Sequence, residues 1–436
     1  MRINTVTVIG VTGTMGANIA AIFASFGNAK VYCVGRELDR VKATIPRIVK
    51  SVKADSIAKN LIPADYSMLE ECVAQSDLIF ESSKEDINVK FEIAMRVGKA
   101  MNPKAVSGTG SSGLSITEIC EHYPSELRSR FFGIHMFNPP YTLTLCELTS
   151  TPYSDVRVKD DLALYLQTVL HRTVVEVKDS PAFLGNRIGF QFINEALQYA
   201  EKYKDNGGID YIDAILGPFT GRSMAPLVTA DFVGLDVHKA IVDNIYENTN
   251  DYANDTFIMP RFACDLVEQG KLGRKRGCGL YQTVKYENGL KRQTVYDINT
   301  GIYRDVIPYV FPFTDKMKIS IAEGDYQKAF ERLINNHSIE AEICLSFLLK
   351  YIIYSLYATE EVGYDISSAD DVMATGFNWC PPLAMYNALS TVADVNALVQ
   401  ERLPEICKAI DIDHYMKEIK QSKYDYRIYF KSGRRR

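Results

Sequence analysis

The N-terminal part of the chain alternates between short apolar runs and longer stretches with helical patterning. Short apolar runs bounded by turn residues are typical of strands buried in a sheet. Helical stretches, the first over residues 17–26, separate several of them. This alternation predicts an α/β domain with a mostly parallel sheet covered on both faces. The expected strands are residues 5–9, 30–34, 78–80, 105–107, 131–135, 143–148 and 173–177.

A glycine-rich turn joins the first expected strand to the first expected helix. Gly10, Gly13 and Gly16 follow the spacing G-x-x-G-x-x-G, one residue longer than the usual dinucleotide-binding spacing. Glycines permit a tight turn and a close approach of backbone to pyrophosphate, and the helix N-terminus offers free N–H groups. We interpret the turn as part of a Rossmann-like nucleotide site. An ordinary tight turn is the alternative.

The pattern becomes helical after Asp179-Ser180-Pro181 and stays so to about residue 266. Short strands and turns are expected over 282–315, with a hairpin turn at Glu287-Asn288-Gly289. From residue 339 the chain is helical again. We therefore expect four segments: a Rossmann-like dinucleotide-binding domain (1–181), a first helical domain (182–281), a β-rich linker (282–338) and a second, degenerate helical domain (339–436).

Two stretches of the helical part have matching spacing. Ala225-Pro226-Leu227, followed by Asp231 and Gly234, aligns with Pro381-Pro382-Leu383, followed by Asn387 and Ser390. We interpret this as a duplicated helical unit with a decayed second copy. Coincidence between two helix starts is the alternative. If the copies pack on each other, the chain forms an internal pseudo-dimer and is expected to be monomeric, with a homodimer as the alternative.

Composition is ordinary for a globular protein, with 47% hydrophobic and 24% charged residues among 436. The net charge of −5 gives no reason to expect a nucleic-acid partner. The nine cysteines include no C-x-x-C pair, which favours reduced thiols over disulfides or a metal site. With no apolar run long enough for a membrane span and a strand close to the start, we expect no membrane segment, no signal peptide and a cytoplasmic location.

The end of the second strand differs from many NAD-binding folds, which have an acid there for the ribose hydroxyls. This chain has Gly35-Arg36-Glu37. A guanidinium can grip a 2′-phosphate through two N–H groups. We therefore favour NADP(H) over NAD(H), or a lax choice between them. In the alternative, Arg36 is a surface charge and Glu37 reaches the ribose.

One histidine differs from the other five in its setting. His135 ends an apolar strand, and Glu147 lies twelve residues later in the next apolar run. An imidazole can accept a proton near neutral pH. A carboxylate on its other nitrogen would fix the tautomer and stabilise the imidazolium. Together with the glycine turn, this pair suggests hydride transfer coupled to proton transfer.

Several motifs occur together with this histidine. They are Gly133-Ile134-His135-Met136-Phe137-Asn138-Pro139, and the segments 107–112, 179–187 and 229–236. Over residues 3–281 the chain resembles the L-3-hydroxyacyl-CoA dehydrogenase family. Residues 369–379 resemble a second helical domain, as in the long bacterial members. The resemblance implies a Rossmann-like domain followed by two mostly helical dehydrogenase C-terminal domains.

The resemblance also implies roles for individual residues. The family interconverts 3-hydroxyacyl-CoA and 3-oxoacyl-CoA in fatty acid β-oxidation, with NAD as the expected cofactor and hydratase or thiolase partners possible. By this resemblance His135 is the base, Glu147 orients it and Asn186 positions the substrate. The hydroxyl that bonds the substrate oxygen belongs to Ser111, or else to Ser112 or Thr109. The residues near the cofactor are Glu85, Lys90 and Asn138.

Two rival interpretations remain. The chain could be a Rossmann dehydrogenase of a 3-hydroxy acid without CoA, because no motif identifies the CoA group. It could also be a non-catalytic acyl-CoA-binding subunit, if the lengthened glycine turn cannot hold a dinucleotide.

Overall fold

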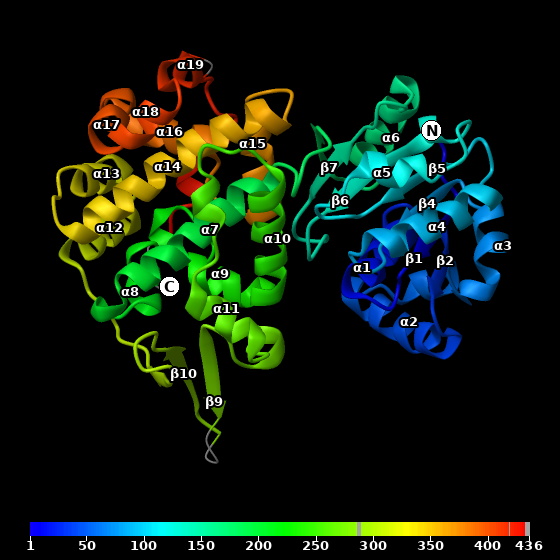
Figure 1. Cartoon of the computed structure of the whole chain (residues 1–436), viewed down its shortest axis with the longest axis horizontal. Helices are drawn as coiled ribbons and strands as arrows, with labels where there is room; N and C mark the ends of the chain where they lie inside the picture. Colours follow the sequence, from blue (N-terminus) through cyan, green and yellow to red (C-terminus); the bar gives the residue numbers. More distant parts are fainter. Residues whose placement is uncertain (286–288, 418, 432–436) are drawn as a thin grey trace. The chain divides into compact units, whose positions relative to one another are not determined.

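The computed structural model describes residues 1–285, 289–417 and 419–431. The chain divides into two compact units, one of residues 1–183 with 362–364, the other of residues 184–361 with 365–436. Residues 1–183 of the first unit are coloured blue to blue-green in Figure 1. Most of the turn expected at Glu287-Asn288-Gly289 lies outside the described residues.

The first unit is built on an eight-stranded sheet in the order β3-β2-β1-β4-β5-β6-β7-β8. All neighbours are parallel except β6 and β7, so the predicted mostly parallel sheet is confirmed. The edge strand β3 was not expected, because Pro63 and partly exposed residues interrupt its apolar pattern. The strands are β1 (Thr5–Ile9), β2 (Lys30–Gly35), β3 (Leu61–Asp65), β4 (Leu78–Glu81), β5 (Val106–Thr109), β6 (Phe131–Met136), β7 (Leu145–Thr149) and β8 (Thr173–Val177).

Helices connect these strands. They are α1 (Thr14–Ser25), α2 (Leu38–Val52), α3 (Leu69–Ala74), α4 (Ile87–Ala100), α5 (Ile116–Glu121) and α6 (Val156–Thr168). Helix α1 is almost entirely buried, and its alanines let it lie close to the sheet. It shares one hydrophobic core with β1, α2 and α6. This packing fixes the direction in which the N-terminus of α1 points.

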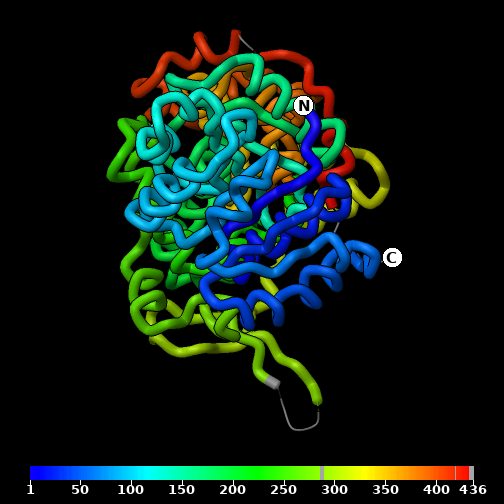
Figure 2. The backbone as a smooth tube through the Cα atoms, turned by 90° about the vertical axis from the view of Figure 1, so that its right-hand side faces the viewer, coloured from blue at the N-terminus to red at the C-terminus, as the bar shows by residue number. Residues whose placement is uncertain are grey.

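The second unit begins with helices that surround α7. They are α7 (Gly185–Lys202), α8 (Ile209–Ile215), α9 (Pro226–Val233), α10 (Leu235–Asn248) and α11 (Arg261–Glu268). A small antiparallel sheet follows, with β9 (Tyr281–Lys285), β10 (Lys291–Tyr296) and β11 (Tyr303–Asp305) in the order β11-β10-β9. The β9–β10 pair projects from the helices of its unit (Figures 1 and 2).

The segment expected to be a β-rich linker is β-rich only in its first half. After β11 the chain forms α12 (Pro312–Glu323) and α13 (Tyr326–Ile334). Phe313, Met317 and Ile321 are buried four residues apart, which is helical spacing, and Pro312 occupies the first turn of α12, where its missing N–H costs nothing. The prediction of a β-rich segment over 282–338 is therefore wrong for residues 312–334.

The C-terminal helices are α14 (Ile339–Val362), α15 (Ser368–Val372), α16 (Pro382–Ser390), α17 (Val395–Arg402), α18 (Pro404–Ala409) and α19 (Ile412–Lys417). Hydrogen bonds in this part repeat those of the first helical segment. Asp213 accepts a bond from the amide of Leu227 at 2.8 Å, and Asp370 accepts the matching bond from Leu383 at 2.8 Å. Both carboxylates thereby bind the N-terminus of the helix that begins at the aligned proline, α9 or α16.

A second pair of bonds follows the same alignment. Asp231 accepts from the amide of Leu280 at 2.7 Å, and its aligned residue Asn387 accepts from the amide of Ser422 at 3.0 Å. The change from carboxylate to amide therefore keeps the acceptor. These matched contacts support the interpretation of a duplicated unit.

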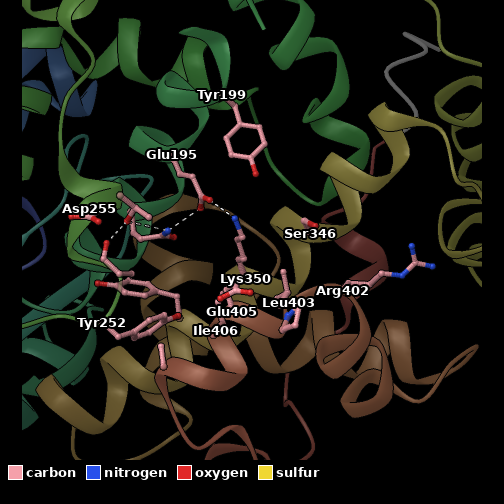
Figure 3. A pocket seen from close by; sticks show the side chains of 16 residues that line it. Glu195, Tyr199, Tyr252, Asp255, Ser346, Lys350, Arg402, Leu403, Glu405 and Ile406 are labelled. Atoms are coloured by element: carbon pink, nitrogen blue, oxygen red, sulfur yellow. Dashed lines mark hydrogen bonds and ion pairs between the residues drawn. The ribbon is translucent and has the colours of Figure 1, made fainter. Parts of the chain in front are cut away.

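The two helical segments pack directly on each other. Glu195 of α7 forms an ion pair with Lys350 of α14, and Gln191 donates to the same carboxylate at 3.0 Å (Figure 3). These side chains line a cavity of about 420 Å³. Nearby, the fully buried guanidinium of Arg222 lies 3.7 Å from the ring centre of Phe192 and 4.7 Å from that of Trp379.

Candidate active site

Five parallel strands bring their carboxyl ends to one edge of the sheet. In the order β2-β1-β4-β5-β6, this edge presents Arg36, the glycine turn, Ser82, the loop after Thr109 and His135. With about 4.8 Å between neighbouring strands, the ends of β2 and β6 lie about 19 Å apart. Ligands of doubly wound folds bind along this edge. The fold therefore lines up the predicted cofactor residues with His135.

The three glycines of the turn differ in what requires them. Gly10 has a φ of +86°, and a Cβ there would lie 2.2 Å from the carbonyl oxygen of Ser82. A Cβ on Gly16 would lie 2.4 Å from the carbonyl oxygen of Gly10, so packing excludes side chains at both positions. At Gly13 the nearest atom would be 3.4 Å away. Gly13 is also the N-cap of α1 without a side-chain bond, which leaves the helix N-terminus open to an anion.

A cavity of about 760 Å³ lies beside this turn. Its lining includes Gly10, Gly13, Gly35, Arg36, Tyr66 and Arg96. A Cβ on Gly35 would lie 2.6 Å from a methyl group of Val41, so an acid at this position would displace the start of α2. Arg36 is exposed and has no hydrogen-bond or ion-pair partner within the described part of the chain, whereas Glu37 pairs with Arg40 at 3.0 Å.

His135 and Glu147 are directly opposite each other on the antiparallel strands β6 and β7. The Nδ1 atom of His135 lies 2.8 Å from Oε2 of Glu147, and both side chains are buried. The rings of Phe137 and Phe183 lie 4.7 and 5.4 Å from the imidazole centre. Their apolar faces keep the ring in place, and Nε2 has no partner among the described residues.

Lys90 lies inside the first unit between two carboxylates. Its Nζ is 2.9 Å from Oε2 of Glu81 and 3.5 Å from Oε2 of Glu85, and its side chain is 1% exposed. Burial disfavours ionised Glu81, but Lys90 and the bonds from Ser83 and Thr109 outweigh burial and lower the pKa of Glu81. Lys90 is therefore held in place by charge and has little surface left for a ligand.

The serine loop after β5 is organised by Glu85. The hydroxyl of Ser111 donates to Oε1 of Glu85 at 2.6 Å and accepts from the amide of Leu114 at 3.1 Å. The hydroxyl of Thr109 donates a hydrogen bond to Oε2 of Glu81 at 2.6 Å. Ser112 uses only its backbone N–H on Glu85 and is partly exposed. Of the three hydroxyls considered from the sequence, that of Ser112 is the one without a partner among the described residues.

Asn138 is exposed three residues after His135, and Asn18 of α1 donates to its side-chain oxygen at 3.0 Å. Buried Arg172 bonds the carbonyl oxygen of Pro140 in the same loop. Sequence analysis did not identify Asn18 or Arg172, since neither stands in a motif; the position of Arg172 directly before an expected strand was the one available signal. Asn186 belongs to the other unit, where it is buried as the second residue of α7.

No group of three or more His, Cys, Asp or Glu side chains among the described residues is arranged to hold a metal ion. No helix in the same part of the chain has the length and apolar character needed to cross a bilayer.

Comparisons with known proteins agree with this geometry. Residues 5–180 match the family described as "3-hydroxyacyl-CoA dehydrogenase, NAD binding domain", and residues 183–283 match "3-hydroxyacyl-CoA dehydrogenase, C-terminal domain". A probable 3-hydroxyacyl-CoA dehydrogenase of Deinococcus radiodurans is 32% identical over 305 residues, covering 67% of this chain and 86% of that protein.

A probable 3-hydroxyacyl-CoA dehydrogenase of Bacillus subtilis is 27% identical over 353 residues, covering 79% of this chain but only 43% of that longer protein. Among solved structures, a 3-hydroxybutyryl-CoA dehydrogenase of Escherichia coli has the same fold over 97% of both chains, with a TM-score of 0.68 and 20% identity. The sheet edge, the glycine turn and both family matches lead to one conclusion: the chain is an oxidoreductase that belongs to the 3-hydroxyacyl-CoA dehydrogenase family.

Proposed function

We propose that this protein interconverts 3-hydroxyacyl-CoA and 3-oxoacyl-CoA with a nicotinamide cofactor. The observation that carries the proposal is the 2.8 Å contact between Nδ1 of His135 and the buried carboxylate of Glu147. It leaves Nε2 as the nitrogen available to a substrate. The family match to residues 5–180 supports a nicotinamide dinucleotide on the same sheet edge.

In the oxidising direction, Nε2 of His135 takes the proton of the 3-hydroxyl group. The nicotinamide supplies the other half of the reaction when bound, because it accepts the hydride from C3. The imidazolium that forms is stabilised by the charge of Glu147, and the reverse reaction returns the same proton. A positioned base of this kind typically contributes about 10²–10⁴-fold to the rate.

A donor to the substrate oxygen would stabilise the charge that develops during hydride transfer. The resemblance assigns this role to Ser111 and Asn186. Since the proton of Ser111 is donated to Glu85, we favour Ser112 as the direct donor and assign Ser111 and Glu85 to ordering the loop. Asn186 remains the second donor that the resemblance implies.

For the cofactor, we propose NADP(H) as the favoured form, with NAD(H) also accepted. Arg36 lines the cavity beside Gly35 and is free to bind a 2′-phosphate, whereas the usual ribose-binding acid has no room at position 35. Gly10, Gly13 and Gly16 would hold the pyrophosphate. Glu85 and Lys90 would act indirectly, by supporting the loop around Ser111.

The test is a spectrophotometric assay of the purified protein with NADH or NADPH. Acetoacetyl-CoA should be reduced with either coenzyme, while free acetoacetate should be reduced at least about tenfold more slowly, because binding contacts to the CoA group are lost. Equal rates with free acetoacetate would support a dehydrogenase of a simple 3-hydroxy acid. No turnover, combined with acyl-CoA binding, would support the non-catalytic alternative. A cytoplasmic location and a hydratase or thiolase partner remain expectations.

A further inference from the structure

The loop between β6 and β7 is tied to two helices of the first unit by side chains outside the family motifs. Asn18 of α1 donates from Nδ2 to Oδ1 of Asn138 at 3.0 Å. The hydroxyl of Tyr141 lies 3.3 Å from Oδ1 and 3.4 Å from the backbone oxygen of Asn18, and 2.8 Å from Oγ of Ser51 on α2. Asn18 therefore contacts both the loop's exposed amide and the tyrosine in the middle of the loop.

This arrangement sets the direction in which the amide of Asn138 faces. A side-chain amide has an acceptor end and a donor end. Asn18 turns its NH₂ group to Asn138 and binds the oxygen of that residue, while its own Oδ1 faces the hydroxyl of Tyr141. The NH₂ group of Asn138 is left as the exposed end. Asn138 can therefore offer a hydrogen-bond donor, and not an acceptor, to a ligand.

The location suggests which ligand receives this donor. Asn138 is three residues beyond His135, at the end of the sheet edge where chemistry is proposed. Asn18 is in the first two turns of α1, the helix that begins at Gly13. The contact thus joins the helix proposed to bind the pyrophosphate to the loop that follows the proposed base. A dinucleotide bound along this sheet edge would reach from one to the other, and its nicotinamide half carries carboxamide and hydroxyl oxygens.

We propose that Asn18 is a positioning residue for the coenzyme: it holds Asn138 so that the NH₂ group of Asn138 donates to an oxygen on the nicotinamide half of the dinucleotide. This inference rests on the proposed function, since it requires a bound nicotinamide. It concerns the polarity of the amide and not merely the stability of the loop.

Two substitutions separate polarity from stability. Asn18→Ala removes the bond and lets the Asn138 amide turn. Asn18→Asp has nearly the same shape, but its carboxylate can only accept, so it would draw the NH₂ group of Asn138 away from the coenzyme. If Asn18 acted only by stabilising the loop, Asn18→Asp would bind the coenzyme better than Asn18→Ala, because Asp keeps a hydrogen bond that Ala lacks.

The experiment measures the dissociation constants of NADH and NADPH by fluorescence, together with kcat and KM for acetoacetyl-CoA. For the favoured coenzyme, we expect Asn18→Ala to weaken binding by about threefold and Asn18→Asp by more than about tenfold, with less effect on the KM for acetoacetyl-CoA. Ser25→Ala, on the same helix with its hydroxyl bonded to Ala21, is the matched control and should leave binding unchanged. Melting temperatures verify that the variants fold.

Coenzyme binding by Asn18→Asp that equals or exceeds that of Asn18→Ala would overturn the inference. Because Asn18→Asp also places a negative charge on the helix proposed to bind the pyrophosphate, a double-mutant cycle of Asn18→Ala and Asn138→Ala gives a second test without a change of charge: additive losses in coenzyme affinity contradict the inference, and non-additive losses support it. Failure of the wild-type protein to bind either reduced coenzyme is a different result, because it refutes the proposed function itself.

Discussion

Arg36 differs from the other cations that line the nucleotide cavity because it has no partner among the described residues. Lys84 pairs with Asp86, and Arg96 pairs with Glu70. An unpaired guanidinium can bind a phosphate without first giving up an ion pair. Arg36 is therefore favoured as the ligand of the NADP(H) phosphate both by its position after β2 and by its lack of an ion-pair partner.

Replacing Arg36 by alanine should weaken NADPH binding by about tenfold or more, because charge-assisted bonds to a phosphate are among the stronger hydrogen bonds. NADH, which has no 2′-phosphate, should bind within about twofold of the wild type. Titration of protein fluorescence with each coenzyme measures both constants. Arg40→Ala is the matched control, since Arg40 is exposed on α2 and pairs with Glu37. Equal losses for the two coenzymes would rule out the phosphate role.

At the scale of elements, the strands were predictable because sheet strands buried on both faces are continuous apolar runs. That Glu147 lies on the strand next to His135 was also expected, from two adjacent apolar segments, but the antiparallel direction of this pair was not. Strand β3 and helices α12 and α13 were missed. Their patterns are weak, because β3 contains Pro63 and α12 buries only a narrow stripe that includes Phe313 and Met317.

The partners of the site residues were less predictable than the elements. Nothing in the sequence showed that Ser111 donates to Glu85 or that Asn18 reaches Asn138, since each contact joins segments far apart in the chain. Such contacts depend on side-chain direction after folding, which neither periodicity nor motif spacing describes.

Helix α2 ends at a residue with an unfavourable backbone. Its C-cap, Lys53, has a φ of +52° and an αL conformation, which glycine adopts without strain. Because Lys53 is exposed, Lys53→Gly should stabilise the first unit by about 0.5–1 kcal/mol. Lys50→Gly, inside the same helix, should instead destabilise it by about 1 kcal/mol. Urea denaturation followed by circular dichroism measures both; equal signs would contradict the argument.

His238 of α10 gives the second unit a pH-dependent stability. It is fully buried against Asn194 of α7, and burial lowers the pKa of His238 to about 3. Between this value and the unfolded pKa of about 6.5, only the unfolded chain binds the proton, so stability is lost as pH falls through that range. From pH 7 to pH 5 the loss should be about 2 kcal/mol.

His238→Gln keeps a donor for Asn194 but does not titrate. Urea unfolding of wild type and variant at pH 7 and pH 5 measures the difference. The variant should lose less stability than the wild type on acidification, whereas identical losses would show that His238 is not the responsible group.

At the scale of the whole molecule, the match to a single C-terminal family domain ends at residue 283, while the solved relative from Escherichia coli shares the fold over nearly the whole chain. The second helical segment covers α7 through Lys350, Tyr351 and Trp379. A surface of α7 that a single copy of the helical domain would expose is therefore covered by another segment of the same chain.

Because this face is filled internally, we expect the protein to be a monomer in solution. Light scattering coupled to size-exclusion chromatography should give a mass close to the 49.0 kDa of one chain. A stable species of about twice this mass, unchanged on dilution, would show that another surface mediates dimerisation and that internal packing does not remove the need for a partner.

The most direct test of the account is the turnover of His135→Gln with acetoacetyl-CoA and its reduced coenzyme. We expect kcat to fall by at least about 100-fold, because the proton donor is lost, while the coenzyme still binds as in the wild type. His337→Gln is the matched control, since His337 also contacts a glutamate, Glu342, but is exposed in the other unit. A His135→Gln enzyme that keeps about a tenth of the wild-type rate would contradict the assignment of His135 as the acid–base group.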